Sequence, residues 1–80
     1  MTPREARALR VHERVEVAFR GRHVATGEGR VDWVPGSVAH VVHVPQLGVR
    51  VNLERQPLVG KRVTGFRVVV HEPVNLRRPQ

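Results

Sequence analysis

The sequence predicts a mainly β domain, a small and bent five-stranded barrel preceded by a short N-terminal helix. Eighteen of the 80 residues are valine, a β-branched residue that favours strands. Most of these valines alternate with polar residues in short runs, which is the two-residue period of a half-buried strand. Glycine and proline separate the runs and indicate turns. Eighty residues suffice for one modest core, so we expect residues 1–80 to form a single domain.

The first expected element is a helix over about residues 3–10. Thr2 can cap its start, and Pro3 suits the first helical position. Glu5, three residues after the cap, completes a capping box. A helix of this length is marginal alone, so it must pack against the rest of the chain.

The barrel is expected over about residues 11–71, with an irregular basic tail over 72–80. Val15, Val17 and Phe19 alternate with polar residues and begin the strand pattern. We expect turns at residues 21–22 and at Pro35-Gly36. The expected strands cover residues 14–20, 24–34, 37–44, 49–54 and 61–71.

The last expected strand changes its pattern at a glycine. Val63 lies on odd parity, whereas Phe66 and Val68 lie on even parity, and Gly65 stands between them. A glycine at such a switch predicts a β-bulge or a sharp bend. Small barrels use bends of this kind to close.

The aromatic residues and one histidine are expected in the core. Phe19, Trp33 and Phe66 share parity with valines of their strands. His40 shares parity with Val38 and is expected to be partly buried. With its three aromatic side chains in the core, the chain would offer no ring on which nucleic-acid bases could stack.

Two segments resemble the KOW element of SH3-like barrels. Residues 15–21 (VEVAFRG) give alternating valines before a glycine, and residues 29–34 (GRVDWV) give a Gly-x-Val-x-x-aliphatic strand. The resemblance implies an SH3-like five-stranded barrel with a nucleic-acid role. A helix followed by five bent strands also resembles the Sm-like barrels in architecture, which implies assembly into rings.

The charge suggests a polyanionic partner. The net charge of +7 lies at the chain ends: residues 1–22 contribute +3 and residues 61–80 contribute +4, whereas residues 23–60 sum to zero. Because the first and last strands of an SH3-like barrel pair, the two basic groups are expected to merge. Such a surface would bind the phosphates of DNA or structured RNA without reading bases. The expected contacts are Arg14, Arg20, Arg22, Lys61, Arg62 and Arg67, with Arg77 and Arg78 as a flexible second contact.

An alternative prediction is a protein-interaction or homo-oligomeric assembly module of the phage- or plasmid-accessory type. The neutral middle of the chain is dense in valine, and the adjacent Val41 and Val42 make both faces of one strand partly apolar. A surplus apolar face would need either a partner protein or a second copy of the chain to cover it. In that case the basic ends would meet an acidic protein partner.

Other classes find little support in the sequence. There is no cysteine, so disulfides and thiolate metal sites are excluded. The five histidines lack the convergent spacing of a metal site. The sequence has no Gly-x-Ser-x-Gly motif of a nucleophilic serine and no pair of carboxylates spaced for acid–base catalysis. We therefore expect no catalytic residues, metal or cofactor. No apolar run is long enough for a membrane helix, so a cytoplasmic location is expected.

Overall fold

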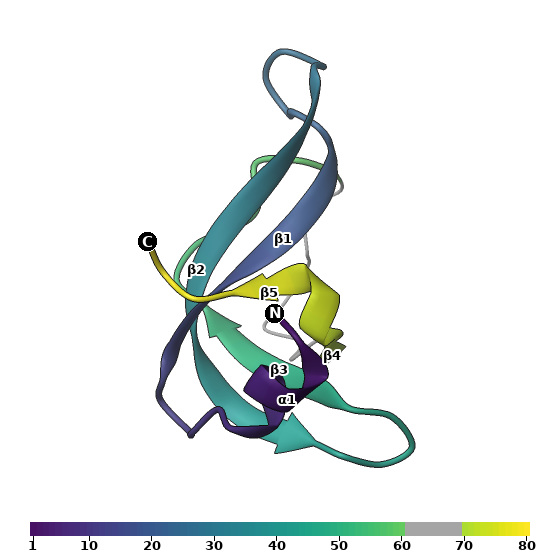
Figure 1. Ribbon diagram of the computed structural model, residues 1–80. Helices are drawn as coiled ribbons and strands as arrows, with labels where there is room; N and C mark the ends of the chain where they lie inside the picture. The colour runs from purple at the N-terminus through teal and green to yellow at the C-terminus, as the bar shows by residue number, and fades with distance from the viewer. Residues whose placement is uncertain (61–69) are drawn as a thin grey trace.

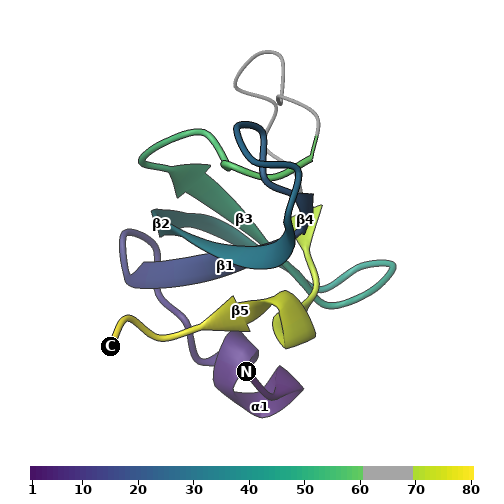
Figure 2. The same ribbon diagram turned by 90° about the horizontal axis from the view of Figure 1, so that it is seen from above.

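The computed structural model describes residues 1–60 and 70–80. They form one five-stranded antiparallel sheet, in the order β4-β3-β2-β1-β5, with a short helix at the N-terminal end (Figure 1). The predicted mainly β class, a sheet of five strands and the N-terminal helix are confirmed. The strands differ from those predicted, because the second and third predicted strands form the single strand β2 and β5 lies in the predicted tail. Within the described residues β4 and β5 are the two edges, so the sheet is bent but not closed into a barrel (Figure 2). The elements are α1 (Pro3–Arg7), β1 (Arg14–Arg22), β2 (Gly29–Val42), β3 (Gly48–Leu53), β4 (Val70–His71), the 3-10 helix η1 (Pro73–Asn75) and β5 (Leu76–Arg77).

Helix α1 begins as predicted but ends three residues early. The Glu5 amide donates to Thr2 Oγ1 at 3.2 Å, and the Thr2 amide donates to Glu5 Oε1 at 3.1 Å, which completes the capping box. The Leu9 amide already bonds to the carbonyl of Ala6, three residues back. Both Ala6 and Leu9 are buried. The chain therefore leaves the helix after about one turn because that is enough to bury its apolar side chains.

The β1–β2 hairpin is longer than predicted. Arg22 pairs with Gly29, so residues 21–22 lie in β1 and do not form a turn. The connection lies further on, where the His23 amide donates to the Glu28 carbonyl at 2.7 Å and Gly27 adopts φ of +72°. Glycine reaches that conformation without steric strain, and it fixes where the hairpin reverses. The strand predicted from residue 24 accordingly starts at Gly29.

Pro35-Gly36 was predicted as a turn, and this was wrong: β2 runs through both residues. They lie where β2 changes partner, because it pairs with β1 as far as Ser37 and with β3 from Gly36 onward. A Cβ at Gly36 would lie 2.6 Å from the carbonyl oxygen of Asn52. The glycine thus permits the close approach of β3, and Pro35 sits opposite residue 54, just beyond the end of β3.

A β-bulge lies inside β2, at a position the sequence did not indicate. Val38 pairs with Val51, but His40 pairs with Arg50, so Ala39 is an extra residue. The bulge reverses the parity of the strand. Val41 therefore packs against the core, and His40, predicted to be partly buried, is exposed. The bulge predicted at Gly65 falls outside the described residues.

The segment predicted as an irregular tail is ordered around Leu76. Leu76 is fully buried and pairs with Val17 of β1. The ammonium group of Met1 donates to the Leu76 carbonyl at 2.8 Å. One buried leucine and two backbone pairs thus turn this part of the chain into a strand.

The main core lies on the face of the sheet against which α1 packs (Figure 2). Phe19 packs against this core, as predicted. Phe66 lies outside the described residues. The buried members of the main core are Ala6, Leu9, Val15, Val17, Val38, Val49, Val51 and Leu76.

Candidate functional site

The register of the sheet defines a second face, opposite the core. Directly paired residues in an antiparallel sheet present their side chains on the same face. Val17 pairs with Val34, and both are buried on the core face. The next pair in either direction along the two strands, and every second pair after it, lies on the opposite face. We call this side the outer face. It carries Arg14, Glu16, Ala18, Arg20 and Arg22 of β1, Val31, Trp33, Pro35, Ser37 and His40 of β2, Arg50 and Asn52 of β3, Val70 of β4 and Arg77 of β5.

The outer face has an excess of positive charge. Its five arginines meet one carboxylate on the face, Glu16, and a second at its border, Glu54. Arg77 Nε lies 2.7 Å from Glu16 Oε1, and Arg14 Nη2 lies 2.7 Å from Glu54 Oε1. The other three arginines have no carboxylate partner among the described residues. The described residues of the face therefore carry a net charge of about +3.

Two of these three arginines bond to neutral acceptors. Arg20 Nη1 donates to Asn75 Oδ1 at 2.7 Å. Arg22 Nη1 lies 3.5 Å from the Gly27 carbonyl oxygen, at the limit of a hydrogen bond. Neutral acceptors orient a guanidinium group without cancelling its charge, so both side chains stay available to an anion.

The structure brings together half of the predicted contacts. Arg14, Arg20, Arg22 and Arg77 share the outer face. Arg78 pairs with Glu13 instead. The predicted sites Lys61, Arg62 and Arg67 lie outside the described residues. Of the predicted C-terminal contacts, the described residues place Arg77 beside β1, through β5. The predicted pairing of the last strand with the first is not seen in the described residues, because β4 pairs with β3.

Arg50 belongs to the outer face but was not predicted as a contact. It pairs across the strands with His40 and with Val70, and it is exposed. Its alternation with Val49 and Val51 already marks it as outward-facing. The zero net charge of residues 23–60 hides its charge, because Asp32 and Glu54 pair with other arginines.

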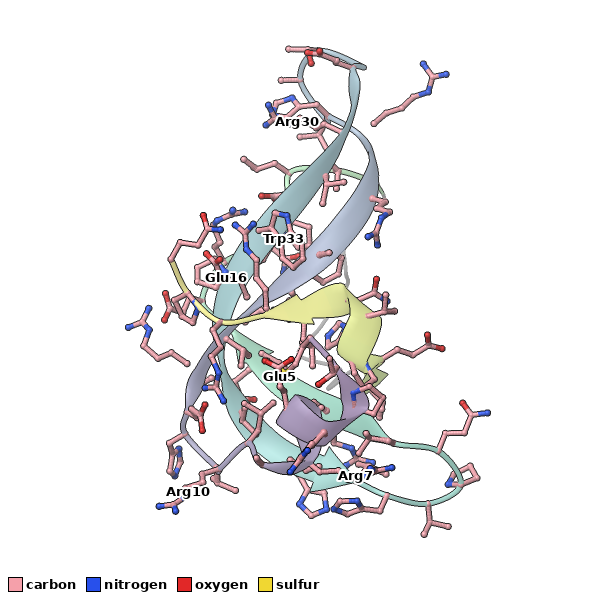
Figure 3. The ribbon with its side chains drawn as sticks, viewed as in Figure 1. Glu5, Arg7, Arg10, Glu16, Arg30 and Trp33 are labelled. Atoms are coloured by element: carbon pink, nitrogen blue, oxygen red, sulfur yellow. The ribbon has the colours of Figure 1, made fainter. Side chains whose placement is uncertain are left out.

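Trp33 was predicted in the core, and this was wrong. It pairs with Ala18 on the outer face and is half-buried. The guanidinium carbon of Arg77 lies 4.1 Å from the centroid of the indole ring, within the range of a cation–π interaction. Figure 3 shows Trp33 and Glu16 near the crossing of β5 over the β1–β2 hairpin. Parity could not decide the face, because the strand is apolar both at Trp33 and at Val34.

The strongest ion pair of the described residues lies on the core face and is structural. Both carboxylate oxygens of Asp32 accept from Arg55, at 2.8 and 2.9 Å, and the Leu58 amide donates to the same carboxylate at 2.8 Å. The hydrogen bonds from Arg55 lower the pKa of Asp32 from 3.8 to about 2, against the opposing effect of burial. Asp32 thus ties the segment after β3 to the first part of β2.

An open groove of about 450 Å³ lies elsewhere, between α1, the β2–β3 connection and η1. Met1, Leu47 and Val74 give it a mostly apolar lining, with one arginine, Arg7, and one acid, Glu72. Among its described lining residues the two charged side chains have opposite signs, so the groove offers no cluster of positive side chains to a polyanion.

The described residues give two further findings. No three histidine, aspartate or glutamate side chains gather there as a metal site would require. None of the helices described is long and apolar enough to span a membrane.

Comparisons with protein-family models, with curated proteins and with solved structures gave no match. The KOW-like and Sm-like resemblances therefore stay predictions.

Proposed function

We propose that this chain binds nucleic acid through its phosphates, with the outer face as the contact surface. The observation that supports this most is the arrangement of five arginines on one solvent-facing side of the sheet, against two glutamates. A surface with a net positive charge raises the local concentration of polyanions and speeds their association. Each phosphate neutralised by arginine also releases a counterion, which adds free energy at low salt.

The spacing of the arginines suits an extended polyanion. Arg20 and Arg22 are alternate residues of β1 and so lie about 6.6 Å apart along the strand, twice the rise per residue. Arg50 extends the charge across β2 to β3. Among the residues that the structure describes on this face, these three arginines have no carboxylate partner, so we expect them to contribute more of the affinity than Arg14 and Arg77. Arg14 must first give up part of its bond to Glu54, but both side chains are about half exposed or more, and a pair of that kind stabilises little.

The experiment that tests the proposal is charge reversal at Arg20 and Arg50, measured by anisotropy with labelled duplex DNA, structured RNA and single strands. A salt series from about 50 to 200 mM gives the number of phosphate contacts. We expect the double glutamate variant to lose roughly tenfold or more in affinity and to flatten the log–log salt slope by about 2.

The matched control reverses Arg4 and Arg10, which are exposed and lie off the outer face. Its net charge is the same, so an equal loss in both variants would mean that total charge, rather than the face, sets the affinity. Wild-type affinity no better than the roughly 10⁻⁴–10⁻⁶ M of non-specific contact at physiological salt would refute the proposal.

The assembly-module alternative is tested in the same samples by their mass in solution. Val41 packs against the core, so its substitution would test folding rather than association. Val42 is half-buried and follows the bulge. A stable oligomer that Val42→Lys dissociates, together with weak binding of nucleic acid, would favour the alternative.

A further inference from the structure

The central part of the outer face is not simply charged: it holds an aromatic ring with an arginine stacked on it. We infer that the Trp33–Arg77 pair is a stacking site for an unpaired nucleobase, so that the preferred ligand is a single strand or an unpaired loop. This inference rests on the proposed function, since it concerns the same face and the same ligand class.

Arg77 is held in place by three contacts. Its backbone pairs with Glu16 of β1, its Nε bonds to the Glu16 carboxylate at 2.7 Å, and its guanidinium group lies over Trp33 at 4.1 Å. Its two terminal nitrogens have no hydrogen-bond acceptor among residues 1–60 and 70–80. The side chain is thus oriented before any ligand arrives, while most of its donors are unused. An ordered side chain loses little conformational entropy on binding.

The surroundings of the pair suit a flat, mostly apolar group with polar edges. Ala18 lies opposite Trp33, Val31 is two residues away on the same strand face, and Pro35 lies on the other side. Val31 is 43% exposed, which leaves an apolar surface next to the ring. Bases stack on indole rings and on the planes of arginine guanidinium groups. The unused guanidinium nitrogens could then bond to the adjoining phosphate or to a base edge.

A duplex cannot use such a site without cost, because its bases are already stacked and paired. An unpaired base has its faces open and can add to the Trp33–Arg77 stack. Arg20, Arg22 and Arg50 would bind phosphates in either ligand. The stack therefore distinguishes the two ligand classes, whereas the charge does not.

The chain provides its own probe. Trp33 is the only tryptophan and there is no tyrosine, so intrinsic fluorescence reports on this ring alone. We would titrate the full chain with a single-stranded oligonucleotide, with an abasic strand of equal length, and with a duplex of the same sequence. DNA and RNA versions of the single strand would separate the two sources of unpaired bases.

We expect the base-bearing strand to quench Trp33 and to bind more tightly than the abasic strand by roughly fivefold or more, the effect of one stacked base. Arg77→Lys keeps the charge but loses the planar group. It should weaken binding of the base-bearing strand about fivefold or more beyond any loss that it causes for the abasic strand. Arg78→Lys, the neighbouring residue that pairs with Glu13, is the control and should change neither.

The other outcomes separate this inference from the proposed function. Salt-dependent binding of all three ligands with equal affinity and unchanged Trp33 fluorescence would overturn the stacking site and leave the phosphate contact standing. Absence of salt-dependent binding would overturn both. Thermal unfolding of each variant shows whether the fold is kept, and the wild-type titration needs no variant at all.

Discussion

Among the described ion pairs, that of Asp32 with Arg55 has the most buried carboxylate. The Asp32 side chain is 10% exposed and its carboxylate accepts three hydrogen bonds from Arg55 and Leu58. Asp32→Asn removes the charge and leaves the guanidinium group poorly matched. We expect a loss of about 1–3 kcal/mol in the free energy of unfolding, measured by urea denaturation.

Glu54→Gln is the matched control, because Glu54 forms an ion pair with Arg14 in which both side chains are largely exposed. It should cost less than about 1 kcal/mol. The pH dependence gives a second readout. The pKa of Asp32 is about 2 in the folded chain and 3.8 ordinarily, so its contribution is complete above pH 3.8 and is lost as the pH falls toward 2. Asp32→Asn should flatten the stability curve in that window; an unchanged curve would contradict the assignment.

His71 is a second buried residue that can change its charge, but burial rather than an ion pair shifts its pKa. It is 9% exposed, and its ring meets Phe19 edge-on at a centroid distance of 5.7 Å. Burial lowers the pKa of His71 below its ordinary value of 6.5. The unfolded chain therefore binds a proton more readily, and stability should be complete above about pH 6.5 and fall as the pH drops below it.

His71→Gln should flatten this fall between pH 5 and 7, as followed by the thermal midpoint at each pH. His43→Gln, at an exposed histidine, is the control and should leave the slope of the wild type. If both variants keep the wild-type slope, His71 is not the group responsible.

At the scale of elements, the close pairing of β2 with β3 depends on the absence of a side chain at Gly36. A methyl group at Gly36 would lie 2.6 Å from the Asn52 carbonyl oxygen and 2.6 Å from a methyl carbon of Val51. Gly36→Ala should therefore separate β3 from β2 and cost about 1–3 kcal/mol, the range for overpacking. Gly29→Ala changes the same strand where no atom lies within 4 Å. It should change the urea midpoint little, and a comparable loss in both variants would contradict the close approach.

The last strand is held by a single apolar side chain. Leu76→Ala should cost about 2–5 kcal/mol, because Leu76 is fully buried against Val17. Val74→Ala, two residues earlier and 66% exposed, should cost almost nothing. Thermal unfolding compares the two. Leu76→Ala should also weaken binding of oligonucleotides, since Arg77 depends on the same strand for its position.

The sequence predicted elements well where one pattern acted alone. Thr2, Pro3 and Glu5 defined the start of α1, and the alternation of Val15 and Val17 defined the core side of β1. It failed where two local signals competed or where tertiary pairing decided. Pro35-Gly36 is a common turn pair, but here both residues lie inside β2, where the pairing with β1 ends and the pairing with β3 begins. The bulge at Ala39 could not be predicted from a glycine, because none stands at that position.

On the outer face, too, the sequence placed the residues whose position depends on one strand but not those whose position depends on strand pairing. Arg14 and Arg20 follow from parity in one strand, which is a local property. Arg22 was predicted in a turn after that strand, and it reaches the face because β1 extends through it. Arg77 could be placed only once Leu76 was known to be buried against Val17, since two residues are too few for a strand pattern. The face of Trp33 depended on the register of β2 against β1, which no single strand contains.

At the scale of the whole molecule, the placement of charge matters more than its total. Val31→Lys adds a charge to the outer face at a position that is 43% exposed, and Val74→Lys adds the same charge at a position that is 66% exposed and lines the groove instead. We expect only Val31→Lys to tighten binding of duplex DNA, with a log–log salt slope steeper by about 0.9. Equal gains in both variants would mean that the net charge of +7, rather than the face, governs binding.

The short pairing of β5 with β1 also bears on the behaviour of the chain at high concentration. Its two residues cover the backbone of β1 beside Glu16 and Val17, next to some of the most deeply buried valines of the molecule. An uncovered strand edge flanked by such valines is a template for pairing with another chain. Weakening β5 would thus convert a stability defect into self-association, and light scattering of Leu76→Ala at increasing concentration would detect it.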